Sequence, residues 1–142
     1  MTDALLLDTH IVLWLDNGDP RLKEATRIMI DRRWLAGGSV LVSAVSAWEI
    51  ALLADTGRIS LDRSPEAWVE RFVGRPGVEA VPLTCRAASR AYGLQHFERR
   101  DPADRLLVAT AIELACELVT YDGPITDYAL GHGRQSGLRV AA

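Results

Sequence analysis

Two carboxylates stand three residues apart where the segment "RRDPADRLLVATA" (residues 99–111) changes from charged to apolar. Asp101 precedes a proline, which is the pattern of a helix N-cap followed by proline at the first helical position. Asp104 falls in the first turn of that helix, where the helix dipole favours a negative charge. Because the following residues are mostly apolar, the helix is expected to enter the core and to hold Asp104 at the edge of a partly dry environment.

Three more acids accompany apolar segments. Asp8 directly follows "ALLL", Glu49 lies within "VSAVSAWEIA", and Asp122 directly follows "ELVTY". Carboxylates gathered in a partly dry site repel one another, and a divalent cation removes that penalty. A site of oxygen donors without a His or Cys cluster suits Mg²⁺ or Mn²⁺ rather than zinc, and magnesium sites commonly meet phosphate groups.

Each acid also has a purely structural interpretation when it is taken alone. Asp8 suits a helix N-cap, Ser46 and Glu49 have the spacing of a capping box, and Asp122 with Gly123 suits a turn. These interpretations stay open for the single residues. The four acids taken together, two of them emerging from apolar helices, favour a shared site.

The spacing of the apolar residues predicts strands that alternate with helices. Short apolar runs predict strands over residues 4–7, 39–42, 78–83, 118–121 and 138–140. Helical spacing predicts helices over residues 9–15, 21–34, 43–54, 66–73, 86–92 and 102–115, whereas residues 122–133 are expected to form a loop with one helical turn. The alternation is typical of an α/β three-layer sandwich, with a central parallel sheet of about five short strands and helices on both faces. Ligands of such sheets bind at the carboxyl ends of the strands, so all four acids are expected at one edge.

Length and composition fit a single domain over residues 1–142. The chain is 49% hydrophobic and 25% charged with a formal net charge of -3, so it is not a broadly basic surface for nucleic acid. No apolar run reaches the roughly 20 residues of a membrane span, and the N-terminus lacks the features of a secretory signal. Cys85 and Cys116 form no C-x-x-C pair and indicate neither a zinc knuckle nor a disulfide framework. We therefore expect a soluble, cytoplasmic protein.

Four blocks of the sequence resemble the signature blocks of the PIN domain, and especially those of the ribonuclease toxins of VapBC toxin–antitoxin modules. The blocks are "LLLDTHIVLWL", "SAVSAWEIALL", "RRDPADRLLVATA" and "LVTYD", which follow the family's order over almost the whole chain. The resemblance implies a PIN-like fold and a Mg²⁺- or Mn²⁺-dependent endoribonuclease. It also implies RNA as the substrate, a cognate VapB-like antitoxin that neutralises the toxin, and a homodimer.

The resemblance also assigns the acids their roles. Asp8, Asp104 and Asp122 would bind the metal, and Glu49 would be a further ligand or would orient a water. In this hypothesis a water activated by the metal attacks the scissile phosphorus in line and leaves a 5′-phosphate and a 3′-hydroxyl. Products with a 2′,3′-cyclic phosphate would exclude this route.

Four further residues are expected to assist this site. Thr9 and Thr120 match small hydroxyl positions beside it. Asp101 is expected to act mainly as a helix cap, and Asp127 is an auxiliary acid whose position the sequence does not fix. His96 lies several residues before the "DP" pair rather than next to it, so no role is assigned to it.

Arginines are the expected contacts to RNA, because an acidic centre repels RNA unless cations surround it. Arg105, next to Asp104, is the first candidate, although pairing with a local carboxylate explains it equally well. The other candidates for the rim are Arg32, Arg33, Arg58, Arg99 and Arg100. The tryptophans that fall within helical patterns are expected in the core, namely Trp14, Trp48 and Trp68. The sequence therefore predicts no aromatic platform for single-stranded RNA.

Other α/β classes with acids at strand ends fit less well. A phosphoacceptor receiver domain needs a lysine after a late strand, but Lys23, the only lysine, lies early in the chain. A haloacid-dehalogenase-like phosphatase needs an Asp-x-Asp pair, which "DTH" at residues 8–10 lacks. Two alternatives stay open: a catalytically silent PIN-like binding module, and a nuclease that acts on other nucleic-acid substrates.

Overall fold

Five parallel strands form one central sheet in the computed structural model, which describes residues 3–142. The strands are β1 (Leu5–Leu7), β2 (Val40–Ser43), β3 (Val78–Val81), β4 (Glu117–Val119) and β5 (Arg139–Ala141). They lie in the order β3-β2-β1-β4-β5, and every neighbouring pair is parallel. The predicted α/β fold with a central parallel sheet is therefore confirmed.

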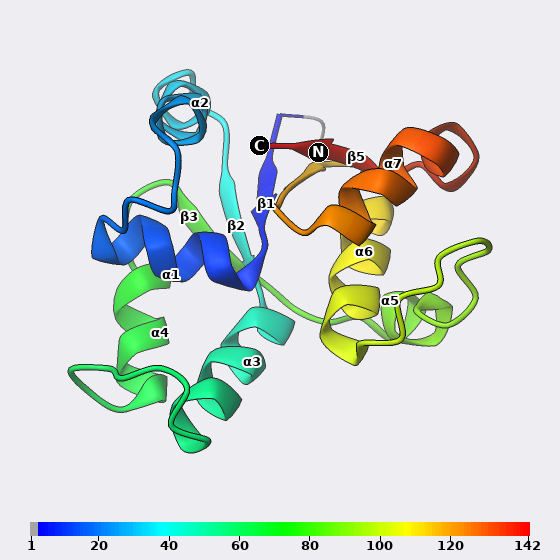
Figure 1. Cartoon of the computed structure of the whole chain (residues 1–142). Helices are drawn as coiled ribbons and strands as arrows, with labels where there is room; N and C mark the ends of the chain where they lie inside the picture. The colour runs from blue at the N-terminus through cyan, green and yellow to red at the C-terminus, as the bar shows by residue number, and fades with distance from the viewer. Residues whose placement is uncertain (1–2) are drawn as a thin grey trace.

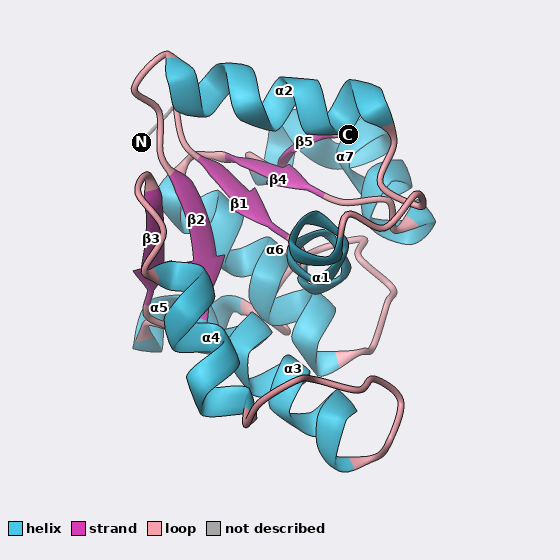
Figure 2. Ribbon diagram, turned by 90° about the vertical axis from the view of Figure 1, so that its left-hand side faces the viewer, coloured by secondary structure: helices cyan, strands magenta, loops and turns pink. Residues whose placement is uncertain are grey.

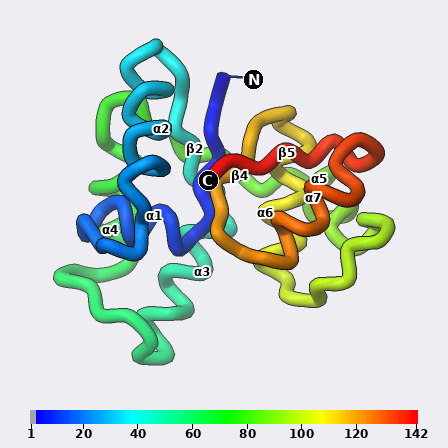
Figure 3. The backbone as a smooth tube through the Cα atoms, turned by 45° about the horizontal axis from the view of Figure 1, so that its top comes forward, coloured from blue at the N-terminus to red at the C-terminus, as the bar shows by residue number. Residues whose placement is uncertain are grey.

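Helices cover both faces of the sheet. They are α1 (Thr9–Asn17), α2 (Glu24–Leu35), α3 (Ala44–Asp55), α4 (Pro65–Val73), α5 (Cys85–Arg90), α6 (Pro102–Leu114) and α7 (Gly123–Ser136). In Figure 1, α1, α2 and α4 lie on one side of the strands, and α5, α6 and α7 lie on the other. The trace in Figure 3 shows the same division, with the blue-to-green helices on one side and the yellow-to-red helices on the other.

The central strand β1 is an uninterrupted run of leucines because both of its faces are buried. Leu5 and Leu7 belong to one core cluster with residues of α1, α2 and α4, whereas Leu6 belongs to a second cluster with residues of α6 and α7. All three side chains are completely buried. A strand that packs on both faces has no side free for polar residues, so the alternation typical of a half-exposed strand is absent.

The strands end where the candidate acids begin. The arrowheads of β1 and β2 point toward α1 and α3 in Figure 2. At the end of β1, Asp8 is the N-cap of α1, and at the end of β2, Ser43 is the N-cap of α3 and accepts a hydrogen bond from the Val45 N–H. The capping box that the spacing of Ser46 and Glu49 would allow is therefore not formed, because α3 already begins one turn earlier.

The segment after β4 differs most from its prediction. Residues 122–133 were expected to form a loop with one helical turn, because they contain three glycines and a proline. They form most of α7, a helix of 14 residues. Pro124 lies in its first turn, where a missing N–H costs nothing, and Asp122 caps it. Ile125 and Tyr128 are buried against the sheet, and this packing outweighs the low helix propensity of glycine.

Some apolar side chains of α2 and α3 are exposed, including a tryptophan that the sequence pattern places in the core. Trp68 is buried as expected, and Trp14 packs against the same core cluster. Trp48 of α3, however, is 53% exposed, and Leu35 at the end of α2 is 76% exposed. The α3 helix lies beyond the carboxyl ends of the strands, so only part of its surface meets the core (Figure 2). Within residues 3–142, no helix is both long and apolar enough to cross a membrane.

Candidate metal centre

The structure brings the four predicted acids to one cavity of about 140 Å³. Asp8 follows β1, and Asp122 follows β4 after two further residues. Glu49 comes from the second turn of α3, and Asp104 comes from the first turn of α6. Parallel strands place the first two acids at the same edge of the sheet, and the helices α3 and α6 supply the other two from beyond it.

Asp8 is the most buried of these acids, with 4% of its surface exposed. Its Oδ1 accepts a hydrogen bond from the Thr9 N–H at 2.7 Å, and its Oδ2 accepts one from the Thr120 hydroxyl at 2.6 Å. The Thr120 hydroxyl also accepts a hydrogen bond from the Asp122 N–H at 3.0 Å. One fully buried hydroxyl therefore fixes the carboxylate of Asp8 and the backbone of Asp122 relative to each other.

The carboxyl groups of Glu49 and Asp104 both have a raised pKa. Burial raises the pKa of the Glu49 carboxyl and outweighs the hydroxyl of Thr9, which lowers it, while the charge of Asp8 raises it further. Burial also raises the pKa of Asp104 to about 7, with the negative charges of Asp101, Asp122 and Asp8 contributing to the shift. The cavity thus concentrates more negative charge than its surroundings compensate.

A guanidinium supplies part of the missing positive charge. Arg99 Nη1 lies 3.1 Å from Asp104 Oδ2, and Arg99 Nη2 lies 2.9 Å from Asp122 Oδ2. Arg99 was one of several arginines predicted at the rim, and its side chain is 33% exposed. Its position shows that a cation is accommodated between these two carboxylates.

The donor set fits a hard divalent cation. The polar side chains that line the cavity are four carboxylates, a threonine and His10, and oxygen donors are what Mg²⁺ and Mn²⁺ prefer. In the described part of the chain, no three His, Cys, Asp or Glu side chains stand close enough together, as they lie, to hold a metal ion. Mg²⁺ held by one or two carboxylates keeps several waters and commonly binds a phosphate as well.

The predicted auxiliary residues lie at different distances from this cavity. Thr9 lines it, and Thr120 contacts Asp8 from behind. Asp101 caps α6 by accepting a hydrogen bond from the Asp104 N–H at 3.1 Å, as its sequence context predicts. Asp127 is exposed and lies on the wall of a neighbouring hollow rather than of the acidic cavity.

Arg105 does not lie on the surface, so its predicted contact with RNA is corrected. The residue is 3% exposed. Its Nε donates to the carbonyl of Arg99 at 2.7 Å, its Nη1 donates to that of Ala91 at 2.8 Å, and its Nη2 donates to that of Phe97. The guanidinium therefore ties the segment before α6 to the helix itself. Arg105 therefore points into the core, whereas its neighbour Asp104 faces the cavity.

His10 also lines the cavity, although no sequence motif pointed to it. Its Nδ1 lies 3.6 Å from Asp8 Oδ2, and its Nε2 accepts a hydrogen bond from the Tyr121 N–H at 3.2 Å. The available signal was its position two residues after the first acid, where a helix that starts at the strand end places it beside the site. It links the segments that carry Asp8 and Asp122.

The parallel sheet and the oxygen donors at its carboxyl edge define an α/β protein with an acidic centre. The family model of the PIN domain matches residues 5–129, and the chain therefore belongs to the PIN domain family. This confirms the resemblance that the four sequence blocks carry.

Individual relatives agree with this assignment. Ribonuclease VapC22 of Mycobacterium tuberculosis (strain ATCC 25618 / H37Rv) is 35% identical over 119 residues, which span 84% of this chain and 87% of that protein. A chain in the crystal structure of VapBC2 from Rickettsia felis, bound to a DNA fragment from their promoter, superimposes with a TM-score of 0.64 at 14% identity, with 97% of each chain covered. DNA-bound VapBC from Salmonella typhimurium gives a TM-score of 0.63 at 19% identity, with 99% of this chain and 98% of that chain covered. The two structural likenesses concern the fold.

Proposed function

We propose that this chain is a divalent-metal-dependent endoribonuclease of the VapC kind, which a cognate VapB-like antitoxin neutralises. The observation that carries the proposal is the convergence of Asp8, Glu49, Asp104 and Asp122 on one cavity. Membership of the PIN domain family and the 35% identity to a protein named as a ribonuclease support RNA as the substrate. The structural neighbours named as VapBC complexes support an antitoxin partner, and we expect a homodimer from the same kinship.

Asp8, Asp104 and Asp122 are the residues that would hold Mg²⁺ or Mn²⁺. When bound, such a cation lowers the pKa of a water and offsets the charge that develops on the scissile phosphate. Asp8 is held in one orientation by Thr9 and Thr120, so little freedom is lost when it binds a cation. Glu49 is half-buried, and its raised pKa suits it to take up a proton at its carboxylate during attack on the phosphorus.

A cleavage assay on total RNA tests the proposal. Purified protein free of antitoxin is incubated with Mg²⁺ or Mn²⁺, with EDTA and the Asp8→Asn variant as controls. Asparagine keeps the size of the buried side chain and its capping oxygen, so a loss of cleavage would reflect the lost charge. We expect discrete, metal-dependent cuts that leave 5′-phosphate and 3′-hydroxyl ends and that disappear in both controls.

Two outcomes would contradict the proposal. Products with a 2′,3′-cyclic phosphate would mean that the 2′-hydroxyl is the nucleophile and that the cavity does not act as described. Folded protein that cuts no RNA with either ion would favour a catalytically silent binding module. Cleavage of DNA but not of RNA would favour a nuclease that acts on other nucleic acids.

A further inference from the structure

A second hollow, of about 280 Å³, lies beside the acidic cavity. Its walls include His96, Arg99, Asp127, Tyr128 and His132. Arg99 belongs to this wall and also contacts Asp104 and Asp122, so it connects the hollow to two of the acids that line the acidic cavity. A group bound in this hollow would therefore lie next to the phosphate that the acidic centre acts on.

Aromatic rings form a continuous row along this hollow. Phe97 packs against Tyr128 with ring centroids 4.8 Å apart, and Tyr128 packs against His132 at 5.6 Å. His132 in turn stacks on His96 at 4.6 Å, with only 11° between the ring planes. The row begins in the core, where Phe97 and Tyr128 are buried, and ends at His96, which is exposed. Its outer end therefore offers a flat ring to solvent.

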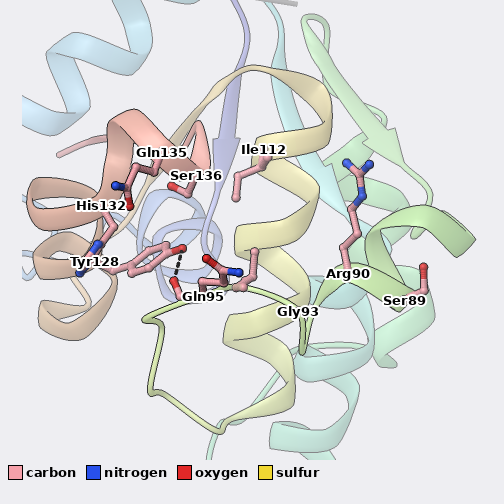
Figure 4. A pocket seen from close by; sticks show the side chains of 10 residues that line it. Ser89, Arg90, Gly93, Gln95, Ile112, Tyr128, His132, Gln135 and Ser136 are labelled. Atoms are coloured by element: carbon pink, nitrogen blue, oxygen red, sulfur yellow. Dashed lines mark hydrogen bonds between the residues drawn. The ribbon is translucent and has the colours of Figure 1, made fainter.

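The backbone of His96 is held in a left-handed conformation, with φ of 68°. Few residues other than glycine adopt this region, and histidine is among the exceptions. The carbonyls on both sides are fixed: the Tyr128 hydroxyl donates to that of Gln95 at 3.1 Å, and the buried Arg105 donates to that of Phe97. Figure 4 shows Tyr128 of α7 reaching the Gln95 carbonyl, with His132 nearby on the same helix. The loop is thus anchored on each side of the residue that presents the outer ring.

The charges of the hollow favour a base over a phosphate. Arg99 on this wall is already paired with Asp104 and Asp122. Glu98 and Asp127 also line the hollow, and their carboxylates repel phosphate but accept hydrogen bonds from the amino groups of nucleobases. Stacking on aromatic rings is the usual way in which proteins hold an unpaired RNA base. On the assumption that the proposed ribonuclease function holds, we infer that this hollow is a nucleobase subsite in which a base of the RNA substrate extends the row at His96.

Fluorescence of 2-aminopurine, which stacking quenches, tests this subsite. A short single-stranded RNA carries the probe at successive positions and is titrated with the Asp8→Asn protein, which we expect to bind RNA without cutting it. His96→Gly removes the outer ring and suits the positive φ, whereas His132→Ala and His132→Phe respectively remove and retain the ring beneath it. Leu130→Ala, on the same helix, 82% exposed and outside the hollow, is the matched control.

We expect quenching at one probe position, lost in His96→Gly and in His132→Ala and retained in His132→Phe and Leu130→Ala. The first two variants should bind the RNA at least about fivefold more weakly, which corresponds to the loss of one stacked base. Equal quenching and affinity in all variants would overturn the subsite. The ribonuclease proposal would survive that result if the wild-type protein still cut RNA with Mg²⁺ or Mn²⁺. Wild-type protein that neither binds nor cuts RNA would overturn both.

Discussion

Arg99 joins Asp104 to Asp122 across the acidic cavity, with its two terminal nitrogens 3.1 Å and 2.9 Å from one oxygen of each carboxylate. These two acids are also candidates for binding the metal. A guanidinium and a divalent cation neutralise the same charges, so the two compete for the carboxylates. Arg99 is carried by the loop before α6 and is partly exposed, which leaves it free to turn away when a cation binds.

Replacement of Arg99 by alanine should therefore tighten the binding of the metal. Partly exposed ion pairs contribute up to about 1 kcal/mol each, so the dissociation constant for Mn²⁺ should fall by about two- to tenfold. Isothermal titration of the metal-free protein measures this directly. Arg100→Ala is the matched control, because Arg100 stacks on Tyr92 and has no contact with the acids. Unchanged or weaker binding in Arg99→Ala would show that the two cations do not compete.

The raised pKa of Asp104 predicts how metal binding depends on pH. An acid with a pKa of about 7 keeps its proton at pH values where an ordinary aspartate is ionised, and that proton must leave before a cation binds. The affinity for Mn²⁺ should therefore rise as the pH increases through about 7, with release of a proton. Affinities measured from pH 5.5 to 8.5, in about half-unit steps, would reveal the midpoint.

Asp101→Asn should move that midpoint to lower pH. The negative charge of Asp101 is the largest contribution, after burial, to the raised pKa of Asp104. Asparagine is an equally good N-cap, so the variant removes the charge and retains the hydrogen bond to the Asp104 N–H. An unshifted midpoint would mean that another group controls the rise in affinity.

The sequence predicted the sheet, most helices and the meeting of the four acids, because these depend on local patterns. The run of leucines before Asp8 and the proline after Asp101 each place an acid at the end of an element. A parallel sheet then brings the strand ends together without further information. The helix α7 was not predicted, because the burial of Ile125 and Tyr128 outweighs glycines that locally favour a loop.

Side-chain direction within α6 does not follow from the local sequence. Asp104 and Arg105 are neighbours, yet one faces the cavity and the other is buried under the loop, a difference that is fixed only once the loop before α6 has folded. His96, in the loop before α6, stacks on His132 of α7, which lies 36 positions later in the sequence. No short-range pattern indicates such a contact, so the aromatic row could not be predicted.

Thr120→Val should reduce the rate of RNA cleavage more than the affinity for RNA. Valine has a similar shape but leaves Asp8 and the Asp122 N–H without the hydroxyl that joins them. Loss of a partner that orients a metal ligand typically costs about 10- to 100-fold in activity. Single-turnover cleavage should fall by that amount, whereas Thr120→Ser, which keeps the hydroxyl, should retain most of the rate. Equal losses in both variants would indicate a packing defect instead.

Replacement of Arg105 should destabilise the fold, because its guanidinium donates to three backbone carbonyls. In Arg105→Met the carbonyls of Ala91, Phe97 and Arg99 lose their donor, and unpaired buried polar groups cost about 1 to 3 kcal/mol each. The free energy of unfolding, measured with urea, should fall by about 2 to 4 kcal/mol, because part of this loss is recovered by water at the loop. Arg105→Lys keeps the charge but cannot reach three carbonyls. Its free energy of unfolding should lie between those of the wild type and Arg105→Met. A variant with normal stability would contradict this structural role of Arg105.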